Sequence, residues 1–101
     1  MLKHPFIERL ERGPLLADGA MGTELYGRGI PPTQCYDALN ITNPDLVQRI
    51  HIDYLNAGAE LIETNTFGAN AIKLGAFGLE NQVYAINRQG GRIARYARDI
   101  A

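Results

Sequence analysis

The chain has 101 residues, of which 46% are hydrophobic and 21% are charged, and its formal net charge at pH 7 is −1. These values are typical of one small globular domain and exclude a disordered chain, a collagen-like repeat and a strongly charged tail. Because the net charge is close to zero, we expect neither a nucleic acid nor an anionic membrane surface as the main partner.

Cysteine usage and hydropathy indicate the compartment. Cys35 is the only cysteine, so this chain alone can form neither an internal disulfide nor a cysteine-based zinc site. No apolar run approaches the ~20 residues of a membrane span, and residues 1–14 lack the hydrophobic region of a secretory signal. We therefore expect a cytoplasmic protein with no membrane partner.

The chain begins with a helix and a short strand. Residues 6–12 predict an amphipathic helix, and residues 14–17 predict a strand buried on both faces, as in a parallel sheet. Residues 18–23 follow as a tight turn, residues 24–26 open a short helix, and residues 27–32 form a loop. A polar turn is thus expected directly at the end of the first strand.

The middle of the chain predicts a second helix and a second strand. Asn43 can cap a helix, Pro44 suits its first position, and Asp45 complements the positive end of the helix dipole. Gly58 is a fitting stop for this helix. Residues 60–64 then predict another buried strand after a very short link.

The last third is predicted to be helical. After a loop at the end of the second strand, residues 71–76 predict a brief helix and residues 82–99 a longer one. Gly90 and Gly91 interrupt the longer helix at a cost of about 1 kcal/mol each relative to alanine. Close packing against a neighbour and a kink are two explanations for them.

The order helix, strand, helix, strand, helix implies a parallel, right-handed βαβ arrangement of the α/β class. We expect no second domain in residues 1–101. Four arginines at helical spacing predict a solvated face on the last helix. They are Arg88, Arg92, Arg95 and Arg98.

Ligands of parallel α/β folds bind at the C-terminal ends of the strands, where residues 18–23 lie. Gly19 and Gly22 let a ligand approach the main chain, and successive N–H groups of such a turn can bind a carboxylate or a phosphate. Asp18 could accept a hydrogen bond from an ammonium group. Together these groups would hold the zwitterion of an α-amino acid. The alternative is that Asp18 only caps the turn that the glycines make.

The second strand ends in another polar segment. Thr64, Asn65 and Thr66 offer donors and acceptors, and Phe67 offers an apolar wall. The alternative is a strand end satisfied by local bonds between side chains and backbone.

Three more titratable residues carry weaker signals. Glu63 could act as an acid or a base but is expected to pair with a neighbouring charge. We expect His51 to be structural and to lie away from the strand ends, and His4 precedes the fold. The spacing of the glycines after the first strand matches neither a dinucleotide-binding motif nor a phosphate-binding loop with its lysine.

The chain resembles the homocysteine S-methyltransferase family over essentially its whole length, with the motifs in the correct order. The resemblance is closest to the bacterial type that carries a methylenetetrahydrofolate reductase domain and to the domain that opens cobalamin-dependent methionine synthase. The matching stretches are LLADGAMGTEL at residues 15–25, Asp37-Ala38-Leu39-Asn40 with Asn43-Pro44 and His51, and AGAELIETNTFGAN at residues 57–70.

The resemblance implies a (β/α)8 barrel that binds homocysteine at its C-terminal face and methylates its sulfur to give methionine. It also implies a zinc ion, held by three cysteines of later strands, that keeps the sulfur as the nucleophilic thiolate. Asp18 and the backbone of Gly19, Ala20 and Met21 would hold the amino-acid head group. Residues 64–67 would form the second wall of the pocket.

The chain is shorter than such a barrel, which has about 250 residues. We therefore expect residues 1–101 to be the amino-terminal part of a homocysteine-binding barrel domain, with about two strands, that transfers no methyl group alone. The zinc ligands would lie outside this chain, and Cys35 is not assigned to zinc. Open sheet edges would favour self-association. The methyl donor is undetermined, with a folate or cobalamin system among the possibilities.

Two other interpretations stay open. The chain could be a non-catalytic βα module that keeps only the amino-acid-binding half of a site. It could also belong to another barrel class, such as an aldolase-like lyase. The second is disfavoured because Lys3 and Lys73 lie away from the predicted strand ends, where a Schiff-base lysine would be needed.

Overall fold

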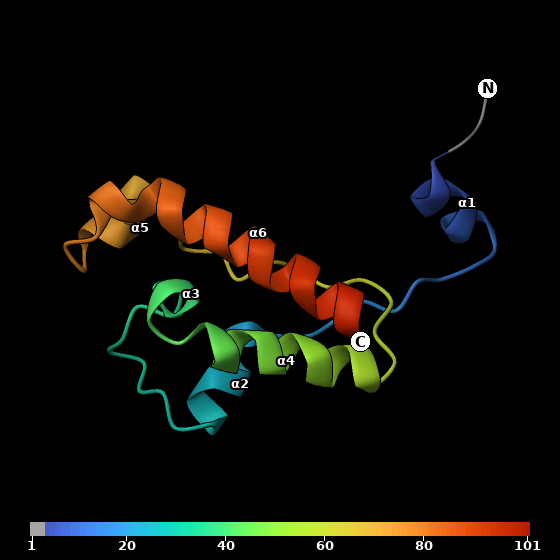
Figure 1. The fold of residues 1–101 in the computed structure, drawn as a ribbon, viewed down its shortest axis with the longest axis horizontal. Coiled ribbons are helices and arrows are strands. Elements are labelled where there is room, and N and C mark those ends of the chain that lie inside the picture. The colour runs from blue at the N-terminus through green and yellow to red at the C-terminus, as the bar shows by residue number, and fades with distance from the viewer. Residues whose placement is uncertain (1–3) are drawn as a thin grey trace.

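The computed structural model describes residues 4–101, which are mainly helical (Figure 1). No helix in this range is both long enough and apolar enough to cross a membrane. The elements in chain order are α1 (Pro5–Glu11), α2 (Met21–Gly27), α3 (Leu39–Thr42), α4 (Pro44–Asn56), α5 (Ala71–Gly75), the 3-10 helix η1 (Glu80–Gln82) and α6 (Val83–Ile100).

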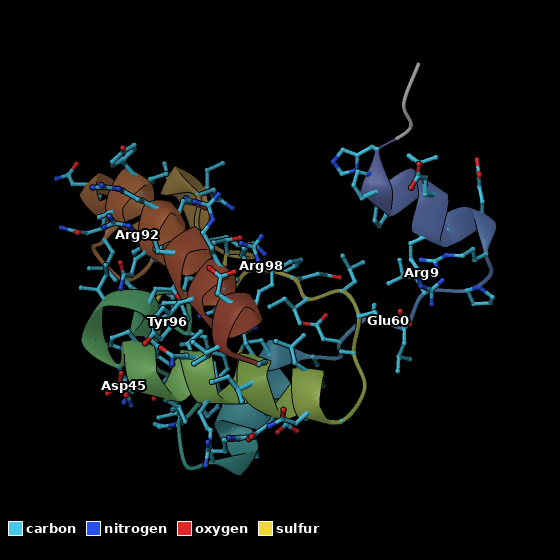
Figure 2. All side chains as sticks on the ribbon, turned by 45° about the vertical axis from the view of Figure 1, so that its right-hand side comes forward. Arg9, Asp45, Glu60, Arg92, Tyr96 and Arg98 are labelled. Atoms are coloured by element: carbon cyan, nitrogen blue, oxygen red, sulfur yellow. The ribbon has the colours of Figure 1, made fainter. Side chains whose placement is uncertain are left out.

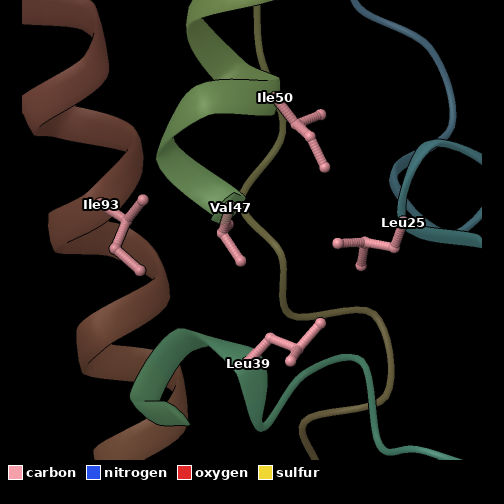
Figure 3. Close-up of a cluster of buried hydrophobic side chains, with 5 residues drawn as sticks. All are labelled: Leu25, Leu39, Val47, Ile50 and Ile93. Carbon is pink, nitrogen blue, oxygen red and sulfur yellow. The ribbon is translucent and has the colours of Figure 1, made fainter. Parts of the chain in front are cut away.

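The two longest helices, α4 and α6, pack against each other, and α3 contacts both of them (Figure 1). The main hydrophobic core lies between these helices and α2. Figure 3 shows its buried side chains, which converge from four helices. They are Leu25, Leu39, Val47, Ile50 and Ile93.

The predicted start of α4 is confirmed in position but not in detail. Pro44 is the first helical residue, and Asp45 lies in the first turn. Asn43 occupies the capping position, yet its side chain makes no capping hydrogen bond. The helix ends before Gly58, whose φ of 115° lies in the left-handed region that favours glycine.

The long helix α6 runs unbroken through both of its glycines. Gly90 is buried, and a Cβ atom there would lie 2.8 Å from Asn40 Nδ2 and 2.8 Å from Thr66 Cγ2. At Gly91, by contrast, a Cβ atom would meet nothing within 4 Å. Close packing therefore accounts for Gly90, and no contact accounts for Gly91. The four arginines of this helix are exposed, as predicted.

The structure corrects the prediction of two strands at residues 14–17 and 60–64. Within the described range these segments run in parallel but share a single β-bridge, between Ala17 and Leu61. The direction of pairing agrees with a βαβ unit, whereas the sheet itself is not formed. The open sheet edges that we expected to favour self-association are therefore absent from residues 4–101.

The pairing stops after one bridge for two physical reasons. Asp18 N donates to Leu61 O at 2.8 Å and Leu61 N donates to Leu16 O at 3.2 Å, as in a parallel ladder. The next N–H of that ladder, from Glu63, donates instead to the side chain of Asp18. Leu16 and Leu61 are also exposed, so residues 4–101 supply no layer that buries these segments as a parallel sheet is buried.

The short helices were predicted less well than the long ones. Helix α1 and helix α5 lie within a residue of their predicted positions, whereas α2 begins three residues before the predicted start at residue 24. Helix α3 and η1 were not predicted.

Helix α1 lies apart from the other helices (Figure 1). Figure 2 shows Arg9 of α1 beside Glu60, to which its guanidinium donates at 2.8 and 3.0 Å.

Candidate functional site

A cavity of about 520 Å3 lies where the two paired segments end. Its walls come from the turn after Ala17, the loop before α3 and the loop after Leu61. All eight residues predicted to bind the substrate line this one cavity. They are Asp18, Gly19, Ala20, Met21, Thr64, Asn65, Thr66 and Phe67.

The side chain of Asp18 connects the two walls of the cavity. Its Oδ2 accepts a hydrogen bond from the backbone N–H of Glu63 at 3.1 Å. No group in residues 4–101 donates to its other oxygen, Oδ1. Asp18 thus has one oxygen bound to the backbone and one that can accept a hydrogen bond from a ligand. The alternative in which Asp18 only caps the turn explains the first oxygen and not the second.

The turn after Asp18 presents backbone donors. In the described chain, the N–H groups of Gly19, Ala20 and Met21 donate to no protein group. Three neighbouring free N–H groups are suited to a carboxylate. This wall of the cavity therefore offers three backbone donors next to the carboxylate of Asp18.

Tyr54 of α4 holds this turn in place. Its hydroxyl donates to Ala20 O at 2.9 Å, and a Cβ atom at Gly19 would lie 2.9 Å from the same hydroxyl oxygen. Partial desolvation raises the pKa of Tyr54, and the nearby charges of Glu24 and Asp18 raise it further. The phenol therefore stays protonated and able to donate at neutral pH.

The opposite wall combines hydroxyl groups with an aromatic ring. The hydroxyl oxygens of Thr64 and Thr66 are 2.7 Å apart and share a hydrogen bond. Phe67 is 92% exposed, and Lys73 Nζ lies 4.2 Å from the centre of its ring. The two threonines fit the alternative of local bonds at a strand end, whereas Phe67 offers an open apolar surface.

Comparisons with known proteins give the family of the chain. The sequence profile described as homocysteine S-methyltransferase matches residues 15–101. The chain belongs to the homocysteine S-methyltransferase family.

Two curated relatives are methionine synthases. The one from Mycobacterium leprae (strain TN) is 38% identical over 101 aligned positions, and the one from Mycobacterium tuberculosis (strain ATCC 25618 / H37Rv) is 36% identical. Each alignment covers 92% of this chain and 8% of the relative. The chain therefore corresponds to a small part of those proteins.

The fold also matches solved structures of the family. The homocysteine methyltransferase MmuM from Escherichia coli aligns with a TM-score of 0.82 in its metallated form and 0.84 in its oxidised form, at 34% identity. The metallated structure is matched over 96% of this chain and 35% of its own length. The chain thus spans about a third of that methyltransferase.

The structure bears on two predictions about titratable residues. Glu63 lines the cavity but makes no ion pair with a described residue, so the expected pairing with a neighbouring charge is wrong. His51 is fully buried, as a structural residue would be, but the charge of Asp18 still acts on it. Burial lowers the pKa of His51, and Asp18 offsets part of that effect.

Several residues of the site were not predicted. Asp37, Lys73 and Phe77 line the cavity, and Asp37 Oδ1 accepts from the N–H of Gly68 at 3.1 Å. The family motif that contains Asp37 was the available signal for it. Cys35 also lines the cavity.

Proposed function

We propose that the complete gene product transfers a methyl group to the sulfur of homocysteine, and that this chain supplies the wall that holds the amino-acid head group. The observation that carries the proposal is the meeting of both predicted polar segments at one cavity. Residues 1–101 would then be part of one homocysteine-binding barrel domain.

The head group is proposed to bind by complementary charge. Asp18 Oδ1 accepts from the ammonium group, and a charge-assisted hydrogen bond of this kind is worth about 1.5–3 kcal/mol. The free N–H groups of Gly19, Ala20 and Met21 donate to the carboxylate. This pairing orients the side chain of homocysteine toward the threonines and the ring of Phe67.

The reaction requires the thiolate of homocysteine. Its sulfur forms a bond to the methyl carbon, and the bond between that carbon and the donor breaks with its electron pair left on the donor. A bound zinc ion would lower the pKa of the homocysteine thiol. The described residues include no group of three or more His, Cys, Asp or Glu side chains that could hold a metal, so they do not fit the zinc site.

The methyl donor is not identified by the residues of this cavity. A folate or cobalamin system is one proposal, since two relatives are called methionine synthases. We also propose a reducing cytoplasmic location, because the thiol of homocysteine must stay reduced for the reaction.

Calorimetric titration of the complete gene product with homocysteine tests the proposal. We expect saturable binding, together with methionine formation when a suitable methyl donor is present. Binding without methyl transfer from any donor would favour the non-catalytic binding module. No binding would contradict the proposed function.

A further inference from the structure

The fully buried side chain of Asn40, in α3, links three parts of the chain. Its Nδ2 donates to the backbone oxygen of Asn65 at 2.8 Å and to that of Ile86 at 3.1 Å. Because backbone carbonyls only accept hydrogen bonds, this pair of contacts fixes the orientation of the Asn40 amide. Its oxygen, Oδ1, must therefore face the side chain of Asn65.

The orientation of Asn65 follows from that of Asn40. Asn65 Nδ2 donates to Asn40 Oδ1 at 3.1 Å and to the backbone oxygen of Tyr36 at 3.0 Å. Both N–H bonds of the Asn65 amide are thus used, and exchanging its oxygen and nitrogen would break both contacts. These partners lie 25 and 29 residues away, so the network is not a local strand-end arrangement.

The carbonyl oxygen of Asn65 is left without a protein partner. No group in residues 4–101 donates to Oδ1. In the same range, the buried side-chain atoms without partners belong to His51 alone, so Oδ1 of Asn65 must reach accessible space. Asn65 is among the residues that line the cavity, so the cavity is where a ligand could reach this oxygen.

We propose that Asn40 is a positioning residue, which fixes Asn65 so that its Oδ1 accepts an N–H from the ammonium group of homocysteine. This inference rests on the proposed function. The thiolate form of homocysteine carries donors only on its ammonium group, and an amide oxygen cannot bind the carboxylate. Asn65 therefore complements Asp18, which binds the same group from the other wall.

Gly90 makes this arrangement possible. A methyl group at residue 90 would lie 2.8 Å from both Asn40 Nδ2 and Thr66 Cγ2, which is closer than carbon atoms tolerate. Asn40 is held by three hydrogen bonds, so any shift to relieve the clash disturbs the Asn65 amide. Gly91 is the matched control, because a methyl group there meets nothing within 4 Å.

The test compares two ligands that differ only in the ammonium group, homocysteine and 4-mercaptobutanoate. Calorimetry on the complete gene product measures the ratio of their dissociation constants for the unaltered protein, Gly90→Ala and Gly91→Ala. We expect Gly90→Ala to reduce the preference for homocysteine by about tenfold, the equivalent of one charge-assisted hydrogen bond. Gly91→Ala should keep the preference.

A second variant covers the case in which Gly90→Ala does not fold. Asn65→Ala removes the proposed acceptor directly and should also reduce the preference by about tenfold. Equal weakening of both ligands in the folded variants would overturn the inference while the proposed function stands. Absence of homocysteine binding by the unaltered protein would instead overturn the proposed function, and the inference with it.

Discussion

Asp18 Oδ2 accepts a hydrogen bond from the backbone N–H of Glu63, with 3.1 Å between the two atoms. In a longer parallel ladder this N–H would donate to a backbone carbonyl. The carboxylate therefore ends the pairing of the two segments and joins their ends across the cavity. Its second oxygen is free of protein donors in residues 4–101 and is available to a ligand.

Replacing Asp18 by asparagine separates these two roles. Asparagine keeps one acceptor for the Glu63 N–H, but it has no charge to offer an ammonium group. We expect a folded protein whose affinity for homocysteine falls by about 10-fold to 100-fold, as measured by calorimetry. Asp18→Ala should show the same loss of affinity and also a lower melting temperature.

Asp99→Asn is the control for this experiment. Asp99 is an exposed residue of α6 that pairs with Arg98, away from the cavity. Asp99→Asn removes the same charge as Asp18→Asn and should leave the affinity for homocysteine unchanged. An unaltered affinity in Asp18→Asn would remove Asp18 from the binding site.

A double-mutant cycle tests the contact between Gly19 and Tyr54. Gly19→Ala forces a methyl group against the tyrosine hydroxyl and should lower the free energy of unfolding by about 1–3 kcal/mol. Tyr54→Phe loses the bond to Ala20 and should cost about 0.5–1.5 kcal/mol. Because phenylalanine also removes the clashing oxygen, the double variant should be destabilised by less than the sum. Additive losses in urea denaturation would argue against the contact.

The buried imidazole of His51 predicts sensitivity to acid. Its pKa lies below the ordinary 6.5 in the folded state, mainly because burial disfavours the charged ring. The unfolded state therefore binds a proton first as the pH falls below 6.5, and folding stability decreases until the lower folded pKa is reached. The loss approaches about 1.4 kcal/mol per pH unit in that window, and none is expected above it.

Melting temperatures between pH 7.5 and pH 5 measure this effect. His51→Leu should reduce the dependence on pH, and it should not destabilise the protein at neutral pH, because both ring nitrogens lack partners. His4→Gln, at an exposed histidine, should behave as the unaltered protein does. If the melting temperature of His51→Leu depended on pH as that of the unaltered protein does, His51 would not be the source of the acid sensitivity.

The contact between Arg9 and Glu60 predicts how α1 is held. Arg9 also donates to the backbone oxygens of Gly13 and Pro14, at 3.3 and 3.1 Å. Because the ion pair is partly exposed, Arg9→Ala should cost less than about 1 kcal/mol overall. Hydrogen exchange should nevertheless become faster in Pro5–Glu11 and stay unchanged at the cavity.

Arg12→Ala is the matched control for α1. The Arg12 side chain is exposed and makes no ion pair with a described residue. Arg12→Ala should leave the hydrogen-exchange rates of α1 unchanged. Equal effects of the two substitutions would show that Arg9 does not anchor the helix.

The helices could be predicted from the sequence where their signals are local. Pro44 marks the start of α4 and Gly58 its stop, and the apolar spacing of α6 continues through both of its glycines. The two strands could not be predicted correctly, because a parallel strand depends on neighbouring strands that periodicity does not reveal. Within residues 4–101, the pairing is limited to the bridge between Ala17 and Leu61.

The site was predictable to the extent that it follows the strand ends. The segments that begin at Asp18 and Thr64 carry glycines, hydroxyls and a carboxylate in a pattern that suggests a ligand, and they do meet at one cavity. Asn40 could not be assigned a role from sequence, because its partners lie 25 and 46 residues away. A buried amide is recognisable only once the segments it joins are placed together.

The most direct test is a crystal structure of the complete gene product with homocysteine bound. We predict that the ammonium group lies within hydrogen-bonding distance of Asp18 and Asn65, and that the carboxylate accepts from the N–H groups of Gly19, Ala20 and Met21. Homocysteine bound elsewhere, or bound in this cavity with its charged head turned away from Asp18, would contradict it.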